Sequence, residues 1–107
     1  MSTALDDIAA ERARQISAEG WTPEHDDEHG TGEMASAAAC YARRAAMQAR
    51  NPDQQGGPVS FWPWDLKWWR PSDPRRNLVK AAALIVAEIE RLDRASARAA
   101  LSMTEGA

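Results

Sequence analysis

The sequence predicts an all-α protein, a small bundle of three main helices with a short fourth helix and a tryptophan-rich loop. Alanine is abundant, β-branched residues are few, and no stretch alternates apolar with polar residues as a half-buried strand would. The chain has 107 residues, of which 44% are apolar and 27% charged, and this composition fits one compact domain. We expect the domain to span residues 1–97, with a frayed tail at residues 98–107.

The helix boundaries follow from capping residues. Thr3 and Asp6 form a capping pair for a first helix over residues 3–19, and Gly20 ends that helix. Thr22-Pro23 starts a short helix over residues 24–29. A second main helix is expected over residues 32–50, and five of its residues share an inner face: Met34, Ala37, Ala38, Tyr41 and Ala45.

The last long helix should begin at Asp73-Pro74 and carry a continuous apolar stripe. Leu78, Ala82, Ile85, Ile89 and Leu92 follow one another at spacings of 4, 3, 4 and 3 residues. This spacing predicts that the stripe packs on the first two helices. Val79 and Val86 would then be left over, and together with part of the tryptophan-rich loop they predict a homodimer or a higher homo-oligomer.

Residues 22–33 hold both histidines of the chain and a dense run of acids. They lie between two helices, so their side chains are able to converge, and His29 and Glu33 are one helical turn apart. One interpretation is a divalent-metal site for Mg²⁺ or Mn²⁺ rather than Zn²⁺. Its candidate ligands are His25, Asp26, Asp27, His29 and Glu33. The alternative is a solvated acidic connector that contains helix caps.

Residues 61–71 carry four of the five tryptophans, and Pro63 and Pro71 argue against a regular amphipathic helix there. The segment either packs across its own helices or presents indoles to a nucleobase. In the second case Trp64, Trp68 and Trp69 are the candidate contacts.

Other function classes find little support. A net charge of −3 gives no sign of a nucleic-acid-binding face. The chain lacks an N-terminal signal sequence and an apolar run of about 18 residues, so we expect neither export nor membrane insertion. The single cysteine, Cys40, fits a reducing cytoplasm. No glycine-rich phosphate loop, dinucleotide fingerprint or nucleophile elbow is present.

Four stretches together resemble the MazG-like group of all-α nucleoside triphosphate pyrophosphohydrolases. They are Glu11-Arg12-Ala13-Arg14-Gln15, Gly20-Trp21, Gly32-Glu33-Met34-Ala35 and residues 76–84, which read Arg-Asn-Leu-Val-Lys-Ala-Ala-Ala-Leu. The resemblance implies a divergent small member of the kind found in phages and prophages. In that family four acidic side chains on two helices bind Mg²⁺, which holds the triphosphate while water attacks between the α- and β-phosphates.

When this pattern is carried over, the four acidic positions fall on His29, Glu33, Asn77 and Lys80, so only Glu33 keeps its acid. A lysine in place of a ligand carboxylate opposes a second Mg²⁺ and suits direct contact with a phosphate. The resemblance therefore implies a nucleotide pocket between Glu33 and the last helix. Its candidate contacts, besides the three tryptophans, are Arg12, Arg14, Arg76, Asn77 and Lys80.

The function that we expect is the binding of a nucleotide or a nucleotide-derived signal. One alternative is an active metal-dependent nucleoside triphosphate pyrophosphohydrolase that uses His29, Glu33 and neighbouring acids. Another is a phage protein whose tryptophan-rich segment binds a host protein, for example a defence protein.

Overall fold

A computed structural model describes residues 3–53, 57 and 60–105 of the chain and confirms the all-α prediction. Its helices are α1 (Ala4–Ser17), α2 (Pro23–Asp26), α3 (Glu33–Arg50) and α4 (Pro74–Glu105), with a single 3₁₀ turn, η1 (Leu66–Trp68), in the tryptophan-rich segment. The described residues include no β-strand. Three long helices, one short helix and an aromatic loop are the elements that the sequence predicts.

The capping residues act as expected. Thr3 and Asp6 form a complete capping box at the start of α1, and the Thr22 hydroxyl accepts a hydrogen bond from the backbone N–H of His25 at the start of α2. Asp73 accepts one from the backbone N–H of Arg76 at the start of α4. Two corners use left-handed backbone, at Gly20 with φ of 74° and at Gly32 with φ of 87°. Since a β-carbon strains this conformation, glycine suits both corners.

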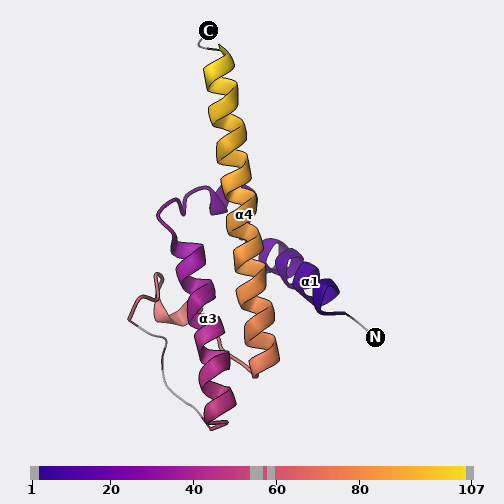
Figure 1. Ribbon diagram of the computed structural model, residues 1–107, viewed down its shortest axis with the longest axis vertical. Helices are drawn as coiled ribbons and strands as arrows, with labels where there is room; N and C mark the ends of the chain where they lie inside the picture. The colour runs from indigo at the N-terminus through magenta and orange to yellow at the C-terminus, as the bar shows by residue number, and fades with distance from the viewer. Residues whose placement is uncertain (1–2, 54–56, 58–59, 106–107) are drawn as a thin grey trace.

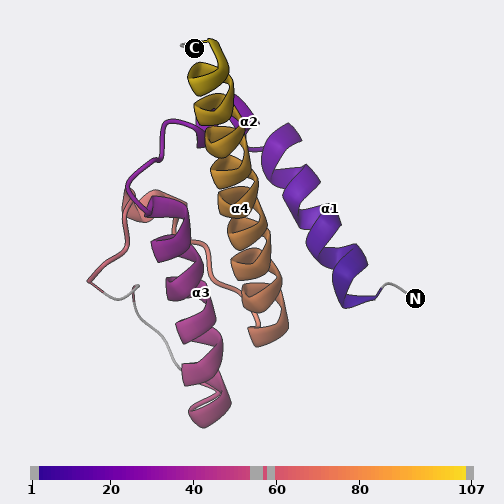
Figure 2. The same ribbon diagram turned by 45° about the horizontal axis from the view of Figure 1, so that its top comes forward.

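The long helix α4 lies between α1 and α3 and packs against both (Figures 1 and 2). Side-chain contacts show that α3 and α4 are antiparallel, because Gln48 near the end of α3 meets Asn77 in the first turn of α4. The residues joining α3 to α4 include the tryptophan-rich residues 61–71, named here the aromatic segment. This segment folds back beside α3 (Figure 1). The C-terminal part of α4 extends beyond the other helices (Figure 1).

The core between α3 and α4 is built from small residues around one tyrosine and one leucine. Its central cluster is Ala37, Ala38, Tyr41, Ala81 and Leu84. The five residues predicted for the inner face of the second main helix are all buried, as is Cys40. Alanine side chains let the two helix backbones approach closely, and the tryptophans pack against the edge of this cluster.

The predicted core face of the last helix is wrong. Leu78, Ile85, Ile89 and Leu92 remain 51%, 48%, 52% and 50% exposed, whereas Val79, which the sequence analysis left without cover, is buried. The buried residues of α4 are Asn77, Val79, Ala81, Ala83, Leu84 and Ala87. The helix therefore turns three alanines, Val79, Leu84 and one amide inward. Its large aliphatic stripe faces outward.

The first helix differs from expectation in a similar way. Leu5, which the helical period places on one face with Ile8 and Ile16, is 78% exposed, while Glu11, Arg12 and Gln15 are buried. The sequence predicts solvated side chains for Glu11, Arg14 and Gln15, or an anionic ligand bound by Arg12 and Arg14. Charged and amide side chains fill the α1–α4 contact because they neutralise one another there, as described below.

The end of the chain also departs from the prediction. The tail expected to fray from residue 98 is helical as far as Glu105, because α4 continues without a break. The loop expected over residues 51–58 lies partly outside the described residues, at positions 54–56 and 58. No helix in the described part of the chain is long and apolar enough to cross a membrane.

Candidate functional site

The aromatic segment is fastened to its own domain by Tyr41 of α3. The Tyr41 hydroxyl accepts a hydrogen bond from the backbone N–H of Arg70 at 3.1 Å and donates one to the carbonyl of Trp68 at 3.4 Å. Trp69 lies against the Tyr41 ring with 4.8 Å between ring centroids, and Trp62 meets the same ring edge-on at 5.9 Å. Trp62 and Trp69 therefore pack across the helices, as one of the two interpretations predicted.

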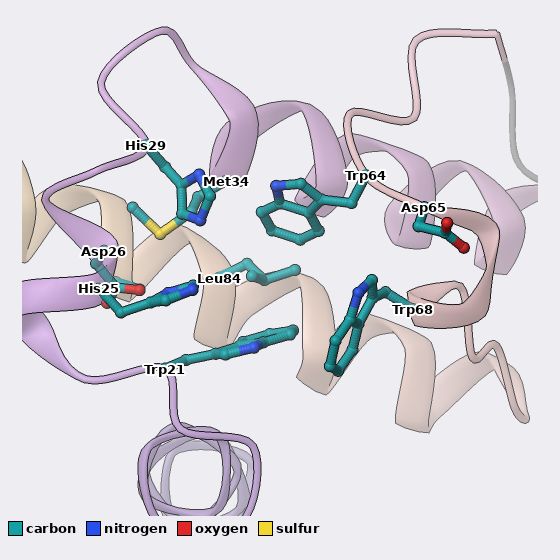
Figure 3. A pocket seen from close by; sticks show the side chains of 10 residues that line it. Trp21, His25, Asp26, His29, Met34, Trp64, Asp65, Trp68 and Leu84 are labelled. Atoms are coloured by element: carbon teal, nitrogen blue, oxygen red, sulfur yellow. The ribbon is translucent and has the colours of Figure 1, made fainter.

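The other indoles line a pocket of about 240 Å³ (Figure 3). Trp21 comes from the corner after α1, Trp64 and Trp68 from the aromatic segment, and the remaining walls from α2, α3 and α4. The lining residues are Trp21, His25, Asp26, His29, Met34, Trp64, Asp65, Trp68, Leu84 and Ala87. Segments far apart in the sequence thus supply three indoles and both imidazoles of the chain to one space.

The rings around this pocket are tilted against one another. The centroid of Trp21 lies 5.6 Å from that of Trp64 and 6.3 Å from that of Trp68, with interplanar angles of 51° and 58°. His29 lies 5.5 Å from Trp64 and 4.9 Å from His25. The rings support one another at their edges while their faces border the shared space, as Figure 3 shows. Such a wall suits a flat, polarisable ligand.

Two polar atoms of the pocket residues are buried without a partner. Among the residues that the structure describes, Nδ1 of His25 and Nε1 of Trp64 find no hydrogen-bonding group. A buried donor or acceptor without a partner costs free energy, and native proteins have few of them. Both atoms belong to residues lining the same cavity. A heterocycle in this pocket would thus lie beside two residues that each have a buried polar atom without a partner among the described residues.

The acidic run between the helices is held by arginines. Asp26 is buried, and its carboxylate accepts a hydrogen bond from Arg12 at 2.9 Å. Burial raises the pKa of Asp26 above its usual value even though Arg12 opposes the change. Arg12 also contacts Glu90 of α4 at 3.1 Å and the carbonyl of Trp21 at 3.2 Å. This guanidinium therefore joins α1, α2 and α4 rather than facing an open anion site.

The other two acidic candidates for metal ligands, Asp27 and Glu33, have separate partners. Asp27 pairs with Arg94 at 2.9 Å and Arg98 at 3.4 Å. Glu33 accepts hydrogen bonds from the N–H and hydroxyl of Thr31 at 2.7 and 2.6 Å, and lies 3.2 Å from Nδ1 of His29. Within the described ranges, no three histidine, cysteine, aspartate or glutamate side chains are grouped so that they could hold one metal ion. The metal site stays a prediction, without support from this geometry.

Two of the predicted phosphate contacts, Arg14 and Arg76, bind the buried carboxylate of Glu11. Arg14 forms two hydrogen bonds of 2.8 Å to Glu11, and Arg76 donates a third to the same carboxylate. Burial alone would raise the pKa of Glu11, but the two guanidiniums hold it below its usual value. Lys80 donates to the carbonyl of Arg70 at 2.6 Å, and its ammonium lies 5.6 Å from the centre of the Tyr41 ring.

Asn77 likewise has a structural role. Its amide nitrogen donates to Gln48 at 2.9 Å and to the Ser72 carbonyl at 3.0 Å, and its oxygen accepts from the Ser72 N–H at 2.7 Å. Because α3 and α4 are antiparallel, Asn77 lies near the end of α3 and Glu33 at its beginning. Among the described residues, Asn77 therefore lies at the opposite end of α3 from Glu33, and the pocket expected between Glu33 and Asn77 with Lys80 stays a prediction. Trp64 and Trp68 line the pocket beside the two histidines instead.

Sequence reasoning missed two parts of this arrangement. The sequence favours Trp21 as a residue that packs at the corner between two helices, whereas in the structure Trp21 lines the pocket. The sequence also did not identify Glu11 as a buried carboxylate that binds two arginines. The spacing of Arg14 and Gln15, three and four residues after Glu11, is the signal that could have identified this carboxylate.

Comparisons of the chain with protein-family models, with curated proteins and with solved structures found no match. The resemblance to MazG-like pyrophosphohydrolases consequently stays a prediction from short motifs.

Proposed function

We propose that the protein binds a nucleotide or a nucleotide-derived signal, with the heterocycle in the pocket formed by Trp21, Trp64 and Trp68. The observation that carries the proposal is that three indoles line one cavity of about 240 Å³, beside two residues, His25 and Trp64, that each have a buried polar atom without a partner among the described residues. Indole faces stack on any nucleobase, and polar atoms at the wall pair with the edge of a ring. Purely apolar ligands would leave His25 Nδ1 and Trp64 Nε1 without partners.

Two cations beside the pocket give the ligand a charge preference. The ammonium of Lys67 lies 5.5 Å, and the guanidinium carbon of Arg70 5.6 Å, from the centre of the Trp68 ring. Both side chains are exposed, and Arg70 also lies 4.0 Å from the Glu19 carboxylate and donates to the Lys67 carbonyl at 3.4 Å. A phosphate that leaves the pocket past Trp68 would meet the ammonium of Lys67 and would compete with Glu19 for Arg70. Asp65 lines the pocket, but its carboxylate is turned away from the centre (Figure 3).

The hydrolase alternative has less support. Asp26, Asp27 and Glu33 are engaged by Arg12, Arg94 and Thr31, and two of the four positions that the resemblance implies for acids hold Asn77 and Lys80. Capture of a host protein by the aromatic segment also has less support, because Trp62 and Trp69 pack against the protein's own core. Binding without turnover is the function that the pocket favours.

Titration with the four ribonucleoside triphosphates and their nucleosides, followed by tryptophan fluorescence and calorimetry, tests the proposal. We expect at least one base to quench the fluorescence. Trp64→Leu should weaken binding of that base roughly 5- to 150-fold, since stacking on an indole contributes about 1–3 kcal/mol. Trp62→Leu is the comparison variant, because Trp62 does not line the pocket, although its ring packs on Trp64 at 5.6 Å as well as on Tyr41 at 5.9 Å. It should lower stability and weaken binding much less than Trp64→Leu does.

The proposed phosphate contacts, Lys67 and Arg70, are tested separately. Lys67→Ala combined with Arg70→Ala should weaken a triphosphate and leave its nucleoside unaffected. Arg43→Ala, a loss of charge at an exposed position of α3, is the control. If no probe binds, or if Trp64→Leu and Trp62→Leu change affinity equally, the pocket is not a nucleotide site.

A further inference from the structure

We propose that two copies of the protein associate through the outward face of α4, in an antiparallel helix pair centred on Ile85. The surface consists of Leu78, Ala82, Ile85, Ile89 and Leu92, named here the α4 stripe. Its four large members are about half exposed, at 48–52% of their surface. A charged residue stands at none of the five positions.

The α4 stripe is a long contiguous apolar surface for a monomer of this size to expose. Soluble monomers rarely leave a contiguous apolar patch larger than a few hundred Å². The four large side chains recur over four helical turns of α4, and α1 and α3 pack on other faces of this helix. The radius of gyration of the chain is 15.8 Å, against about 13 Å expected for a compact domain of about 100 residues. The long, partly unaccompanied α4 accounts for this extension (Figure 1).

A second copy fits this surface because the stripe is complementary to itself. The spacing of 4, 3, 4 and 3 residues is that of a coiled-coil seam. When two stripes run antiparallel about Ile85, Ile85 meets its own copy and Leu78 meets Leu92 of the partner. Ala82, three residues before Ile85, then lies one residue out of level with the partner's Ile89, four residues after it, so a small side chain is next to a large one in both symmetry-related layers. In an isologous two-fold interface each of these contacts occurs twice, apart from the contact on the axis.

The length of α4 also suits this pairing. Its 32 residues extend for about 48 Å, and a stable interface needs roughly 800 Å² from each partner. Five seam layers alone would not reach that area. In this register residues 90–96 of α4 would lie beside residues 74–80 of the partner's α4 and add to it. This inference is independent of the nucleotide proposal, because the stripe includes none of the pocket residues.

Sedimentation of the wild type at about 10–100 µM tests the association, and we expect a dimer. Ile85→Asp places two carboxylates on the two-fold axis in a dry seam and should weaken association more than 100-fold while the circular dichroism remains helical. Leu5→Asp makes the same kind of change at an apolar position of α1 that is 78% exposed and outside the stripe. This control should leave the dimer intact. A monomeric wild type, or a dimer that survives Ile85→Asp, overturns the proposal.

Oxidative cross-linking tests the direction of the helices. Ile85→Cys should form a disulfide-linked dimer, because the two cysteines would meet on the axis. Leu78→Cys should not, since position 78 and its copy would be about 21 Å apart along the pair, far beyond the reach of a disulfide. Wild-type protein, whose Cys40 is buried, is the control and should give no cross-link. Cross-linking through position 78 but not through position 85 would show a different pairing and overturn the antiparallel seam.

Discussion

On one side α4 meets small and aromatic side chains from α3 and the aromatic segment, whereas on its other side it meets buried ions from α1 and α2. The first contact is built on Ala37, Tyr41 and Leu84, with indoles at its edge. The second is built on Glu11 and Arg12, whose partners come from α4, α2 and α1 itself. The central residues of both contacts are buried, yet the two contacts should respond to different substitutions.

The physical difference lies in what a missing partner leaves behind. An apolar contact that loses a few atoms leaves a cavity, and one that gains atoms is strained, so the cost follows volume. A buried ion pair that loses one member leaves an uncompensated charge, and the cost follows desolvation. The comparison therefore predicts that the α1–α4 side is sensitive to charge and the α3–α4 side to size.

Removal of the Arg12 guanidinium should have the largest effect. Arg12→Met keeps most of the aliphatic stem but leaves the buried Asp26 without its cation, and we expect a loss of about 3–5 kcal/mol in the free energy of unfolding. Urea denaturation measures this loss. Combining Arg12→Met with Asp26→Asn should recover a large part of it, because the second change removes the stranded charge. A cost under about 1 kcal/mol for Arg12→Met would contradict the assignment of Arg12 as the tie among α1, α2 and α4.

Enlargement of the alanine contact should have an intermediate effect. Ala37 has no exposed surface and lies in the cluster with Tyr41 and Leu84. Ala37→Leu should therefore overpack the α3–α4 contact and cost about 1–3 kcal/mol in thermal or urea unfolding. Ala35→Leu, the same change at an exposed position of the same helix, should cost under about 0.5 kcal/mol. Equal costs for the two variants would show that α3 and α4 are not closely packed there.

Glu33 is expected to give the smallest effect, and its dependence on pH sharpens the comparison. Hydrogen bonds from Thr31 hold the pKa of Glu33 at about 2, below its usual value of 4.5. A carboxyl group with a lowered pKa in the folded state stabilises the fold above its unfolded pKa and loses that contribution as the pH falls. The wild type should thus be more stable than Glu33→Gln near neutral pH, and the gap should narrow from about pH 5 downward.

Thermal melts of both proteins between about pH 7 and pH 3 measure this gap. A gap that stays constant over the range would mean that the bonds from Thr31 do not favour the ionised carboxylate. The apolar contact between α3 and α4 carries no such titration, so Ala37→Leu should cost nearly the same throughout.

The predicted helix starts were accurate because a cap is a local interaction. Thr3, Thr22 and Asp73 bond to backbone groups three residues away, and no tertiary contact is needed to form those bonds. The left-handed corners at Gly20 and Gly32 are local in the same sense. The existence, order and starts of the helices could therefore be read from the chain. Two ends could not, since the short helix expected over residues 24–29 ends at Asp26 and α4 continues to Glu105.

The candidate site was predictable only in part. The sequence showed that residues 22–33 and the tryptophans are unusual, but it placed the histidines in a metal cluster and the indoles over Asn77 and Lys80. The structure puts His25 and His29 beside Trp64 and gives each acid its own partner. Partners such as Arg94 for Asp27 lie 67 residues away in the chain, so spacing carries no information about them.

By itself the sequence determined the fold class, the helix starts and the set of residues that share each helical face. Only the tertiary structure decided which face of α4 turns inward. The hydrophobic period groups Leu78, Ile85, Ile89 and Leu92 on one side, but it does not say what covers them. Close packing of α3 against Ala81 and Leu84, and the ion pairs from α1, bury other faces of the helix. A core assembled from alanines and compensated charges is possible because close approach and paired charges stabilise a contact without large aliphatic side chains.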